Sequence, residues 1–500
     1  MKKRNLVFFA IITIIILFSN LLSAYQVDLN SCKKAAERKL IELSRSDEFF
    51  IKEIVNIQDE DERIIFHVFL LDPKGYLITT NETNLPPVIA YSFSNNYDYK
   101  IEENILIKIL KADIHNRLEN IPNIPDDLIE RRNSAWKSYL NENIERSDDR
   151  PFEQWPPEGT TPTGGWLEEN WHQNSPYNNF CPMQPFTSDR AVAGCPAVAM
   201  AQILNFHQQT NNTHFNDDDD YYHNYSSYQY WIDDDHVYWS FPSFPQLNDH
   251  LDILNEHYQN DETITNDDKA AITFACGVAA QQVYSPEVSG TFGVDQAFQA
   301  YQRFSFDTTE LLDGNDAALY DRISNNMMNA LPVHLAVVNP PWTMGHNVVI
   351  DGYNTDEYYH LNFGWGGSYN GWYLLPDEIP YGLTVVEGAI VDINFEEIGI
   401  EDENECVKNH LELSNYPNPF NSSTTISFYC HRDAENTEIT IYNLKGQKVI
   451  QLRITNYELG MNEVIWDGKD DSGKSINSGV YFYKLKTDGF SLTKNMILTK

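Results

Sequence analysis

Cysteine is scarce in this chain of 500 residues, and so is positive charge. The six cysteines are scattered and no CxxC pair occurs, which excludes a zinc ribbon and a redox dithiol. With 35 Lys and Arg against 73 Asp and Glu, the formal net charge is −38, and no basic patch offers a surface to nucleic acid. These absences exclude a nucleic-acid-binding protein and raise the question of whether one isolated cysteine is a reactive thiol.

Long apolar runs are also rare, and the one clear run lies at the N-terminus. Basic residues 2–4 precede the apolar stretch 6–18, and the small residues Ser23 and Ala24 follow it. This order is typical of a secretory signal peptide, here residues 1–24. The stretch is shorter than the about 20 residues that a membrane span needs, so we expect no stable span; an uncleaved signal anchor is the alternative.

The rest of the composition is that of a folded protein with several domains. Apolar residues make up 42% of the chain and aromatic residues 13%, which is enough for packed cores. The length predicts two to four domains. Composition and periodicity predict a mixed α+β domain at 25–145, a polar linker and processing region at 146–165, the largest domain at 166–397, an acidic linker at 398–412 and a small antiparallel β-sandwich at 413–500.

Within these domains the patterns predict particular elements. The first domain has expected helices at 30–45 and 104–118 and strands at 64–71 and 76–80. The largest domain has an expected helix after Cys195, another at 267–283, and strands near 331–338, 346–353 and 358–364. The sandwich has expected strands at 424–430, 437–442, 447–454, 462–466 and 479–486. The Asp-rich stretches 217–220 and 233–235 lack the Gly and terminal Glu of an EF-hand loop, so we interpret them as solvated loops and not as calcium sites.

Cys195 stands at the start of a strongly predicted helix. Pro196 suits the first helical position, and the sequence from there to Leu204 is nearly all apolar. The unpaired N–H groups and the positive dipole at a helix start favour a thiolate, and Gly194 lets a substrate backbone approach. A buried structural cysteine is the alternative, and this segment alone does not decide between the two.

A thiol nucleophile needs a base, and the base needs a group that orients it. The sequence GHNVVIDGY, residues 345–353, predicts a strand that starts at His346, and residues 357–363 predict the strand that returns. In this hairpin we expect Asn362 opposite or diagonal to His346, where its side chain can fix the imidazole tautomer.

Three other residues compete for these roles. His334 is the rival base, but its apolar neighbours indicate a core strand. Cys276 lies inside an apolar helix, and Cys181 precedes Pro182 with no helix start after it. The conjunction of Gly-Cys at a helix start, Gly-His at a strand start and Asn in the paired strand favours Cys195 and His346.

Four stretches of the largest domain occur in a characteristic order. They are WHQNSPYNNFCP at 171–182, AGC at 193–195 followed by AMAQI at 199–203, GHNVVIDGY at 345–353, and NFGWGG at 362–367. In this order they resemble the streptopain family of papain-like cysteine peptidases. The resemblance implies a papain-like fold for residues 166–397 and a role for each matching residue.

By this resemblance, Cys195 corresponds to the nucleophile, His346 to the base and Asn362 to the residue that orients the imidazole. Gln173 corresponds to the side chain that forms the oxyanion hole with the backbone N–H of Cys195, where donors must face the developing negative charge. No metal ligand set is implied.

The resemblance also implies a substrate cleft walled by Gly194, Phe363, Trp365 and Gly366. The family usually has Trp at the position of Phe363. Phe can still exclude water from the His–Asn hydrogen bond, but it lacks the indole N–H. This departure is the one feature that favours an inactive binding protein on a peptidase scaffold.

Both flanking domains resemble known modules. PKGYLITT at 73–80 with LPPVIAYS at 85–92 is similar to the streptopain-type prodomain, which implies that residues 25–145 cover the cleft and inhibit the enzyme. NYPNPFN at 415–421 and SGVYFY at 478–483 are similar to the type IX secretion sorting domain, which implies an immunoglobulin-like sandwich. A free-standing accessory domain and a carbohydrate- or protein-binding sandwich are the alternatives.

The sequence therefore predicts a secreted cysteine endopeptidase of α+β class, made as a zymogen. It would hydrolyse peptide bonds through a thiolate and an acyl-enzyme, with no metal or organic cofactor. Its expected partners are protein or peptide substrates, its own prodomain and the type IX secretion machinery, and its expected location is outside a Gram-negative cell or on the cell surface. Acyl transfer to an amine by the same Cys–His pair, and an inactive binding protein, are the alternatives that remain open.

Overall fold

The chain folds into two compact units, Met1–Glu397 and Ile398–Lys500. The computed structural model describes residues 26–59, 61–97, 110–111, 114–115, 117–118, 121–141, 152–338, 345–375, 385–394, 413–417, 420–430, 438–443, 448–453, 460–471, 473–476, 479–486 and 491–498. The expected signal peptide at 1–24, the linker at 398–412, residues 142–151 and most of the helix expected at 104–118 lie outside the described residues.

The described residues of the first unit begin with a helix, four strands and a second α-helix, in agreement with the mixed α+β pattern of its sequence. These are α2 (Leu29–Glu42), β1 (Phe50–Gln58), β2 (Ile64–Asp72), β3 (Tyr76–Thr80), β4 (Val88–Ser92) and α4 (Asp126–Leu140). The expected strands at 64–71 and 76–80 are confirmed, and α2 ends three residues before the expected boundary.

The rest of the first unit contains most of its helices. They are α5 (Cys195–His207), α6 (His236–Trp239), α7 (Phe244–Gln259), α8 (Asn266–Ala279), α9 (Val294–Arg303) and α10 (Leu319–Met328). The strands are β5 (Gln154–Trp155), β6 (Tyr222–Tyr225), β7 (Tyr228–Trp231), β8 (Glu310–Asp313), β9 (Val333–Val338), β10 (Gly345–Asn354), β11 (Tyr358–Asn362), β12 (Gly371–Leu374) and β13 (Val385–Val391).

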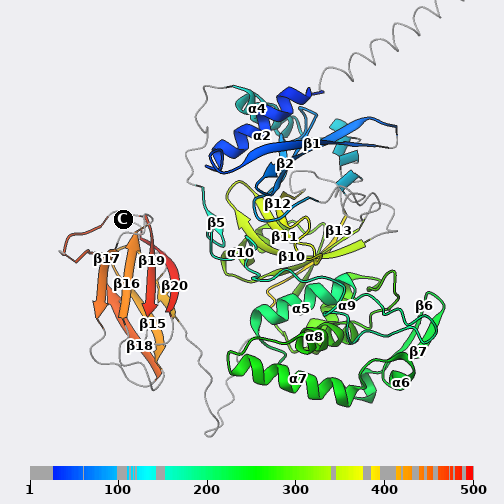
Figure 1. Ribbon diagram of the computed structural model, residues 1–500. Coiled ribbons are helices and arrows are strands. Elements are labelled where there is room, and N and C mark those ends of the chain that lie inside the picture. Colours follow the sequence, from blue (N-terminus) through cyan, green and yellow to red (C-terminus); the bar gives the residue numbers. More distant parts are fainter. Residues whose placement is uncertain are drawn as a thin grey trace, which may run out of the picture. The chain divides into compact units, whose positions relative to one another are not determined.

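One antiparallel sheet runs through the first unit. Its described strands follow the order β1-β2-β3-β4-β12-β11-β10-β9-β13-β8, and β5 pairs with β10 beside this path. Strands β4 and β12 pair through Tyr91 with Trp372 and Ala90 with Tyr373. The domain expected at 25–145 therefore shares a sheet with the domain that follows it, as Figure 1 shows.

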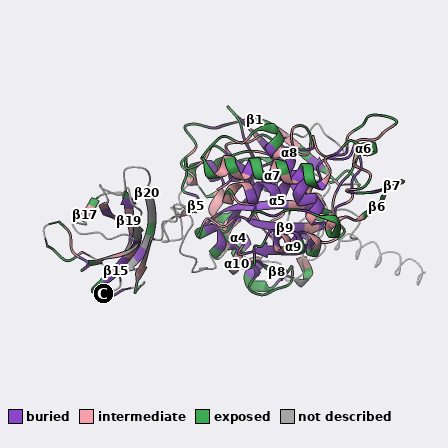
Figure 2. Cartoon of the chain, turned by 90° about the horizontal axis from the view of Figure 1, so that it is seen from below, coloured by how far each residue is buried: buried purple, intermediate pink, exposed green. Residues whose placement is uncertain are grey.

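Helices cover both faces of this sheet. Helices α5, α7, α8 and α9 pack together on one face, where residues 196–204 of α5 are all buried (Figures 1 and 2). Val349 of β10 belongs to this core, whereas its neighbours Val348 and Ile350 belong to the core on the other face. This alternation follows from the two-residue period of a strand, and it decides which side chains of β10 can reach α5.

The segment expected as a loose linker differs from that expectation over residues 152–165. Trp155 and Gln154 of β5 pair with Tyr353 and Asn354 of β10, and the backbone N–H of Trp166 donates to the carbonyl oxygen of Asp351 at 2.6 Å. A polar, Pro-rich composition concealed this pairing, because two residues are too few to show strand periodicity. From residue 152 onward the chain belongs to the fold of the first unit.

The second unit is an antiparallel β-sandwich built on its own apolar core. Its strands are β14 (Leu413–Tyr416), β15 (Thr424–Cys430), β16 (Glu438–Asn443), β17 (Lys448–Arg453), β18 (Gly460–Trp466), β19 (Gly479–Lys486) and β20 (Ser491–Leu498). They form one sheet in the order β14-β15-β18 and another in the order β17-β16-β19-β20. The five expected strands are confirmed within two residues, whereas β14 and β20 were not expected. No helix among the described residues of either unit has the length and apolar character that crossing a membrane requires.

Candidate active site

Cys195 is the first residue of α5, and its surroundings fix the backbone there. Gly194 caps the helix in the left-handed region, with φ of +87°. The Nε2 group of Gln282 donates to the carbonyl oxygen of Ala193 at 2.8 Å, and the N–H of Ala193 donates to the carbonyl oxygen of Gln173 at 2.9 Å. The start of α5 is thus tied to two other segments, and the side chain of Cys195 is half-buried.

The sulfur of Cys195 contacts Asn347 of β10. The Nδ2 group of Asn347 lies 3.9 Å from Sγ. Burial raises the pKa of the Cys195 thiol, and hydrogen bonds from the backbone and side chain of Asn347 only partly oppose this effect. In this arrangement the thiol is protonated at neutral pH, in contrast to the thiolate that the helix start alone predicts.

His346 lies on the face of the sheet that points away from α5. Its Nε2–H donates to the carbonyl oxygen of Phe363 at 2.9 Å, and its ring stacks on Trp365 with ring centroids 4.3 Å apart. The side chain is 3% exposed, and burial lowers the pKa of His346 to about 4, so the imidazole is neutral. Cys195 is therefore hydrogen-bonded to Asn347, whereas the imidazole of His346 is bound to Phe363 and Trp365 on the other face of the sheet.

Asn362 is paired with Val349, which places it three positions along β10 from the expected partner His346. The hairpin turns where the sequence predicted, but the two strands are offset so that the loop after Asn362 brings Trp365 against His346 instead. Because paired residues share a face, Asn362 faces α5. Its Oδ1 accepts the N–H of Gly364 at 3.0 Å, and its buried Nδ2 has no hydrogen-bond partner among the described residues.

His334, the rival base, is fully buried in β9 and contacts the same network as the thiol. Its Nε2 lies 2.7 Å from Oδ1 of Asn347, and its Nδ1 lies 3.2 Å from the hydroxyl of Tyr301 in α9. Burial lowers the pKa of His334 to about 4. Sequence reasoning missed Asn347 and Tyr301. Strand alternation was the available signal for Asn347, because it places this residue on the face opposite to His346.

The remaining site residues lie around these groups. The carbonyl oxygen of Trp171, two residues before Gln173, accepts the N–H of Gly366 at 2.9 Å. Gln173 is half-buried, and Phe363 and Trp365 stack with ring centroids 5.6 Å apart. The loop that carries Phe363, Trp365 and Gly366 is therefore fixed to the segment that precedes Gln173.

The other candidate thiols are enclosed by the fold. Cys276 is buried in α8, as its apolar neighbours predicted, and Cys181 is buried as well. Burial raises the pKa of Cys276 and raises that of Cys181 to about 12, so neither side chain is a nucleophile at neutral pH. No group of three or more His, Cys, Asp or Glu in the described part of the chain is arranged to hold a metal ion.

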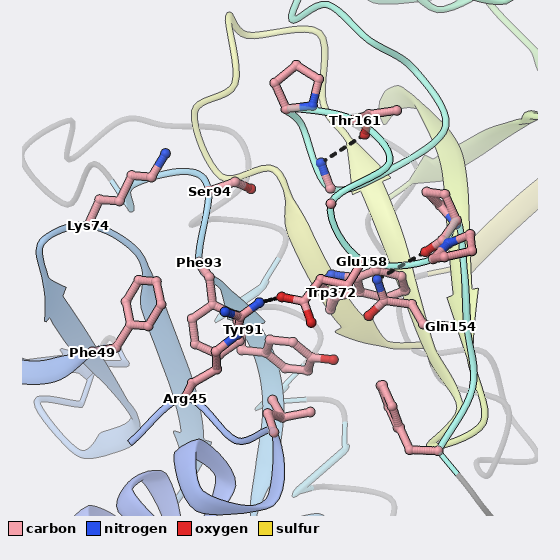
Figure 3. Close-up of a pocket in the computed structure, with 17 residues that line it drawn as sticks. Arg45, Phe49, Lys74, Tyr91, Phe93, Ser94, Gln154, Glu158, Thr161 and Trp372 are labelled. Atoms are coloured by element: carbon pink, nitrogen blue, oxygen red, sulfur yellow. Dashed lines mark hydrogen bonds and ion pairs between the residues drawn. The ribbon is translucent and has the colours of Figure 1, made fainter. Parts of the chain in front are cut away.

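A cavity of about 280 Å³ is lined by the segment 152–164, by side chains of the N-terminal domain and by Trp372 of β12 (Figure 3). Its walls include Phe49, Tyr91 and Trp372, and the ion pair between Arg45 and Glu158 crosses it. Neither Cys195 nor His346 lines this cavity, so it is not the substrate cleft.

Comparison with known proteins places this geometry in context. Streptopain of Streptococcus pyogenes is 23% identical over 368 residues, which cover 69% of this chain and 82% of streptopain. The thiol protease/hemagglutinin PrtT of Porphyromonas gingivalis is 24% identical over 341 residues, and the match spans 34% of that protein. Among solved structures, a mutant fragment of Prevotella intermedia prointerpain A aligns with 69% of this chain and 99% of its own length, at 20% identity and a TM-score of 0.47. Active interpain A aligns with 49% of this chain and 96% of its own length, at 22% identity and a TM-score of 0.35.

Two family matches account for most of the described chain. Residues 171–373 match the Peptidase C10 family, and residues 414–499 match the secretion system C-terminal sorting domain. The sorting domain makes the chain a secreted or cell-surface protein of a Gram-negative bacterium. The chain carries a peptidase C10 domain of the streptopain family, a family of cysteine peptidases, followed by a type IX secretion sorting domain.

Proposed function

We propose that this chain is the zymogen of a secreted endopeptidase in which Cys195 is the nucleophile and His346 the base. The observation that carries the proposal is the position of Cys195 at the start of α5, above the sheet face to which Asn362 also points. His346 is one residue away from that face along β10, so a local rotation of the strand is enough to bring thiol, imidazole and amide together.

In the active arrangement, His346 takes the proton of the Cys195 thiol as Sγ attacks the scissile carbonyl carbon. The oxyanion that forms accepts hydrogen bonds from the backbone N–H of Cys195 and from the side chain of Gln173. The imidazolium then gives its proton to the leaving amine, and the acyl-enzyme is released by a water molecule from which His346 takes a proton. Asn362 orients the imidazole from the face on which its buried amide already lies.

The N-terminal domain is proposed to hold the enzyme inactive. Its contacts with the peptidase region are buried and specific: the hydroxyl of Tyr76 lies 2.7 Å from the hydroxyl of Tyr373, and Nζ of Lys39 lies 3.3 Å from Oδ2 of Asp356. Because β4 extends the sheet at β12, the N-terminal domain also completes an edge that would otherwise expose backbone hydrogen-bonding groups. These contacts support an inhibitory role for the N-terminal domain. We further take the peptidase domain as papain-like and the second unit, whose two sheets match the sorting domain, as an immunoglobulin-like sandwich recognised by the secretion machinery.

The test compares the wild-type chain with Cys195→Ala, both expressed from residue 25 under reducing conditions. After the N-terminal domain is removed by an added protease, we expect the wild-type chain to cleave denatured casein and to bind a thiol-directed epoxide. The Cys195→Ala chain should lose about 10⁴-fold or more of the activity. If neither protein cuts casein, the catalytic proposal is wrong and an inactive scaffold is the better description.

A further inference from the structure

A chain of hydrogen bonds leads from the interior of the first unit to the sulfur of Cys195. Tyr301, His334 and Asn347 form it, with separations of 3.2 Å between Tyr301 Oη and His334 Nδ1, 2.7 Å between His334 Nε2 and Asn347 Oδ1, and 3.9 Å between Asn347 Nδ2 and Sγ. The four residues come from α9, β9, β10 and α5. Tyr301 and His334 are fully buried.

The protonation states decide which atom donates and which accepts in each of these hydrogen bonds. Burial raises the pKa of Tyr301 and lowers that of His334 to about 4, so the phenol keeps its proton and the imidazole is neutral. The Tyr301 hydroxyl donates to Nδ1, which leaves the single imidazole proton on Nε2 to donate to Oδ1 of Asn347. With its oxygen so engaged, the Asn347 amide directs its NH₂ group at the sulfur.

Asn347 and His346 cannot face the thiol together. They are consecutive residues of β10, and β10 pairs with β9 in a regular register from Gly345 onward, so their side chains point to opposite faces. In the present arrangement the amide takes the face of Cys195 and the imidazole is bound to Phe363 on the other face. Rotation of the strand that brings His346 to the sulfur must first break the contacts of Asn347.

We propose that Asn347, positioned by His334 and Tyr301, is an internal lock that keeps His346 away from Cys195. This inference rests on the proposed function, because it assigns His346 the role of base. The lock lies inside the peptidase domain and is separate from the N-terminal domain, so the two restraints act on different parts of the zymogen.

The test measures the reactivity of Cys195 and does not depend on peptidase activity. The full chain is treated with iodoacetamide at pH 6.5, and alkylation of Cys195 is followed by peptide mass mapping, which separates it from the buried thiols. For Asn347→Ala we expect alkylation about fivefold faster than in the wild-type chain, the factor expected for losing one hydrogen bond, because a released His346 forms an imidazolium–thiolate pair with Cys195.

Three further variants separate a lock from a mere packing effect. His334→Leu should accelerate alkylation like Asn347→Ala, whereas His334→Gln, which can still donate to Asn347, should stay near the wild-type rate. The double variant Asn347→Ala with His346→Ala should lose the acceleration, since His346 causes it. Asn329→Ala removes an exposed amide at the C-cap of α10 and serves as the matched control, which should leave the alkylation rate unchanged.

An equal or slower rate in Asn347→Ala overturns the lock, because the amide would then act only as a donor that favours the thiolate. The lock is also overturned if the acceleration survives the loss of His346. Thermal unfolding of each variant is the control that shows the chain is folded. Failure of the proposed function has a different signature: the wild-type chain would fail to cut casein after removal of the N-terminal domain.

Discussion

An added methyl group at Gly194 should destabilise the backbone that positions Cys195. Its φ of +87° lies in the left-handed region, and a Cβ atom built there would stand 2.6 Å from Oε1 of Gln282. Gln282 is fully buried and cannot move away without loss of its 2.8 Å hydrogen bond to the carbonyl oxygen of Ala193. Gly194→Ala therefore combines backbone strain, a collision and a threatened hydrogen bond next to Cys195.

The magnitude follows from these separate effects. A left-handed conformation costs an alanine about 1–2 kcal/mol. Forcing an extra carbon into a packed site typically costs a further 1–3 kcal/mol or so, which includes the shift of the Gln282 side chain. We expect Gly194→Ala to lower the free energy of unfolding by about 3 kcal/mol.

The assay is urea denaturation followed by tryptophan fluorescence, in a Cys195→Ala background that removes the proposed nucleophile. Gly159→Ala is the matched control: Gly159 has φ of +79°, and nothing lies within 4 Å of its built Cβ, so it carries the strain without the collision. It should cost about 1 kcal/mol. The double variant Gly194→Ala with Gln282→Ala should lose about 2 kcal/mol less stability than the sum of the losses in the two single variants, because the collision is gone.

Equal losses in Gly194→Ala and Gly159→Ala would refute this reasoning. They would mean that Gln282 adjusts at no cost and that the start of α5 is not fixed by its contact with the carbonyl of Ala193. In enzymes with the wild-type Cys195, the same substitution should also reduce kcat, because the backbone N–H of Cys195 moves with the strained peptide.

Three further predictions test burial and the contacts of the N-terminal domain. His334 and His346 have pKa values lowered to about 4, so between pH 6.5 and 4 the unfolded chain binds protons that the folded chain does not. The free energy of unfolding should therefore fall as the pH falls from 6.5 to 4. A free energy from urea denaturation that does not change over this range would contradict the prediction. Tyr76→Phe removes a buried hydroxyl with two oxygen partners in the peptidase region and should cost about 1 kcal/mol, and a loss within error of zero would show that these bonds are not stabilising. Lys39→Met keeps the length of a side chain that is 2% exposed but removes the charge beside Asp356. We expect the free energy of unfolding to fall by about 2 kcal/mol. A gain in stability would indicate that burying this cation is unfavourable overall.

Sequence periodicity predicted the elements that carry the site, because these elements are strongly patterned. The helix after Cys195 is nearly all apolar from Pro196 to Leu204 and is buried over that stretch, and the hairpin of β10 and β11 has clear strand signals and a turn. Cys276 was correctly interpreted as a core residue from its apolar helix. In each case local composition and burial agree, which is the condition under which a single sequence predicts structure well.

The expected contact between His346 and Asn362 could not be obtained in this way. Summing residue numbers across a hairpin predicts the pairing to within a few positions, but a shift of three positions decides whether an amide meets an imidazole or a valine. The pairing of β5 with β10 was invisible for a related reason, since Gln154 and Trp155 gain their strand conformation from the edge that they meet. Register and edge pairing are set by tertiary contacts, which a local pattern does not encode.

A sequence motif identifies which residues react, but not whether they are in contact. In this chain the proposed base His346 and its competitor Asn347 are adjacent. Because side chains alternate along a strand, only one of the two can face the sulfur at a time. The inactive arrangement therefore requires no unfolding of the site, since Asn362 and Cys195 already share the face to which His346 must turn. Under the proposed mechanism, activation requires a rotation confined to the first residues of β10, while α5, which carries Cys195, stays fixed.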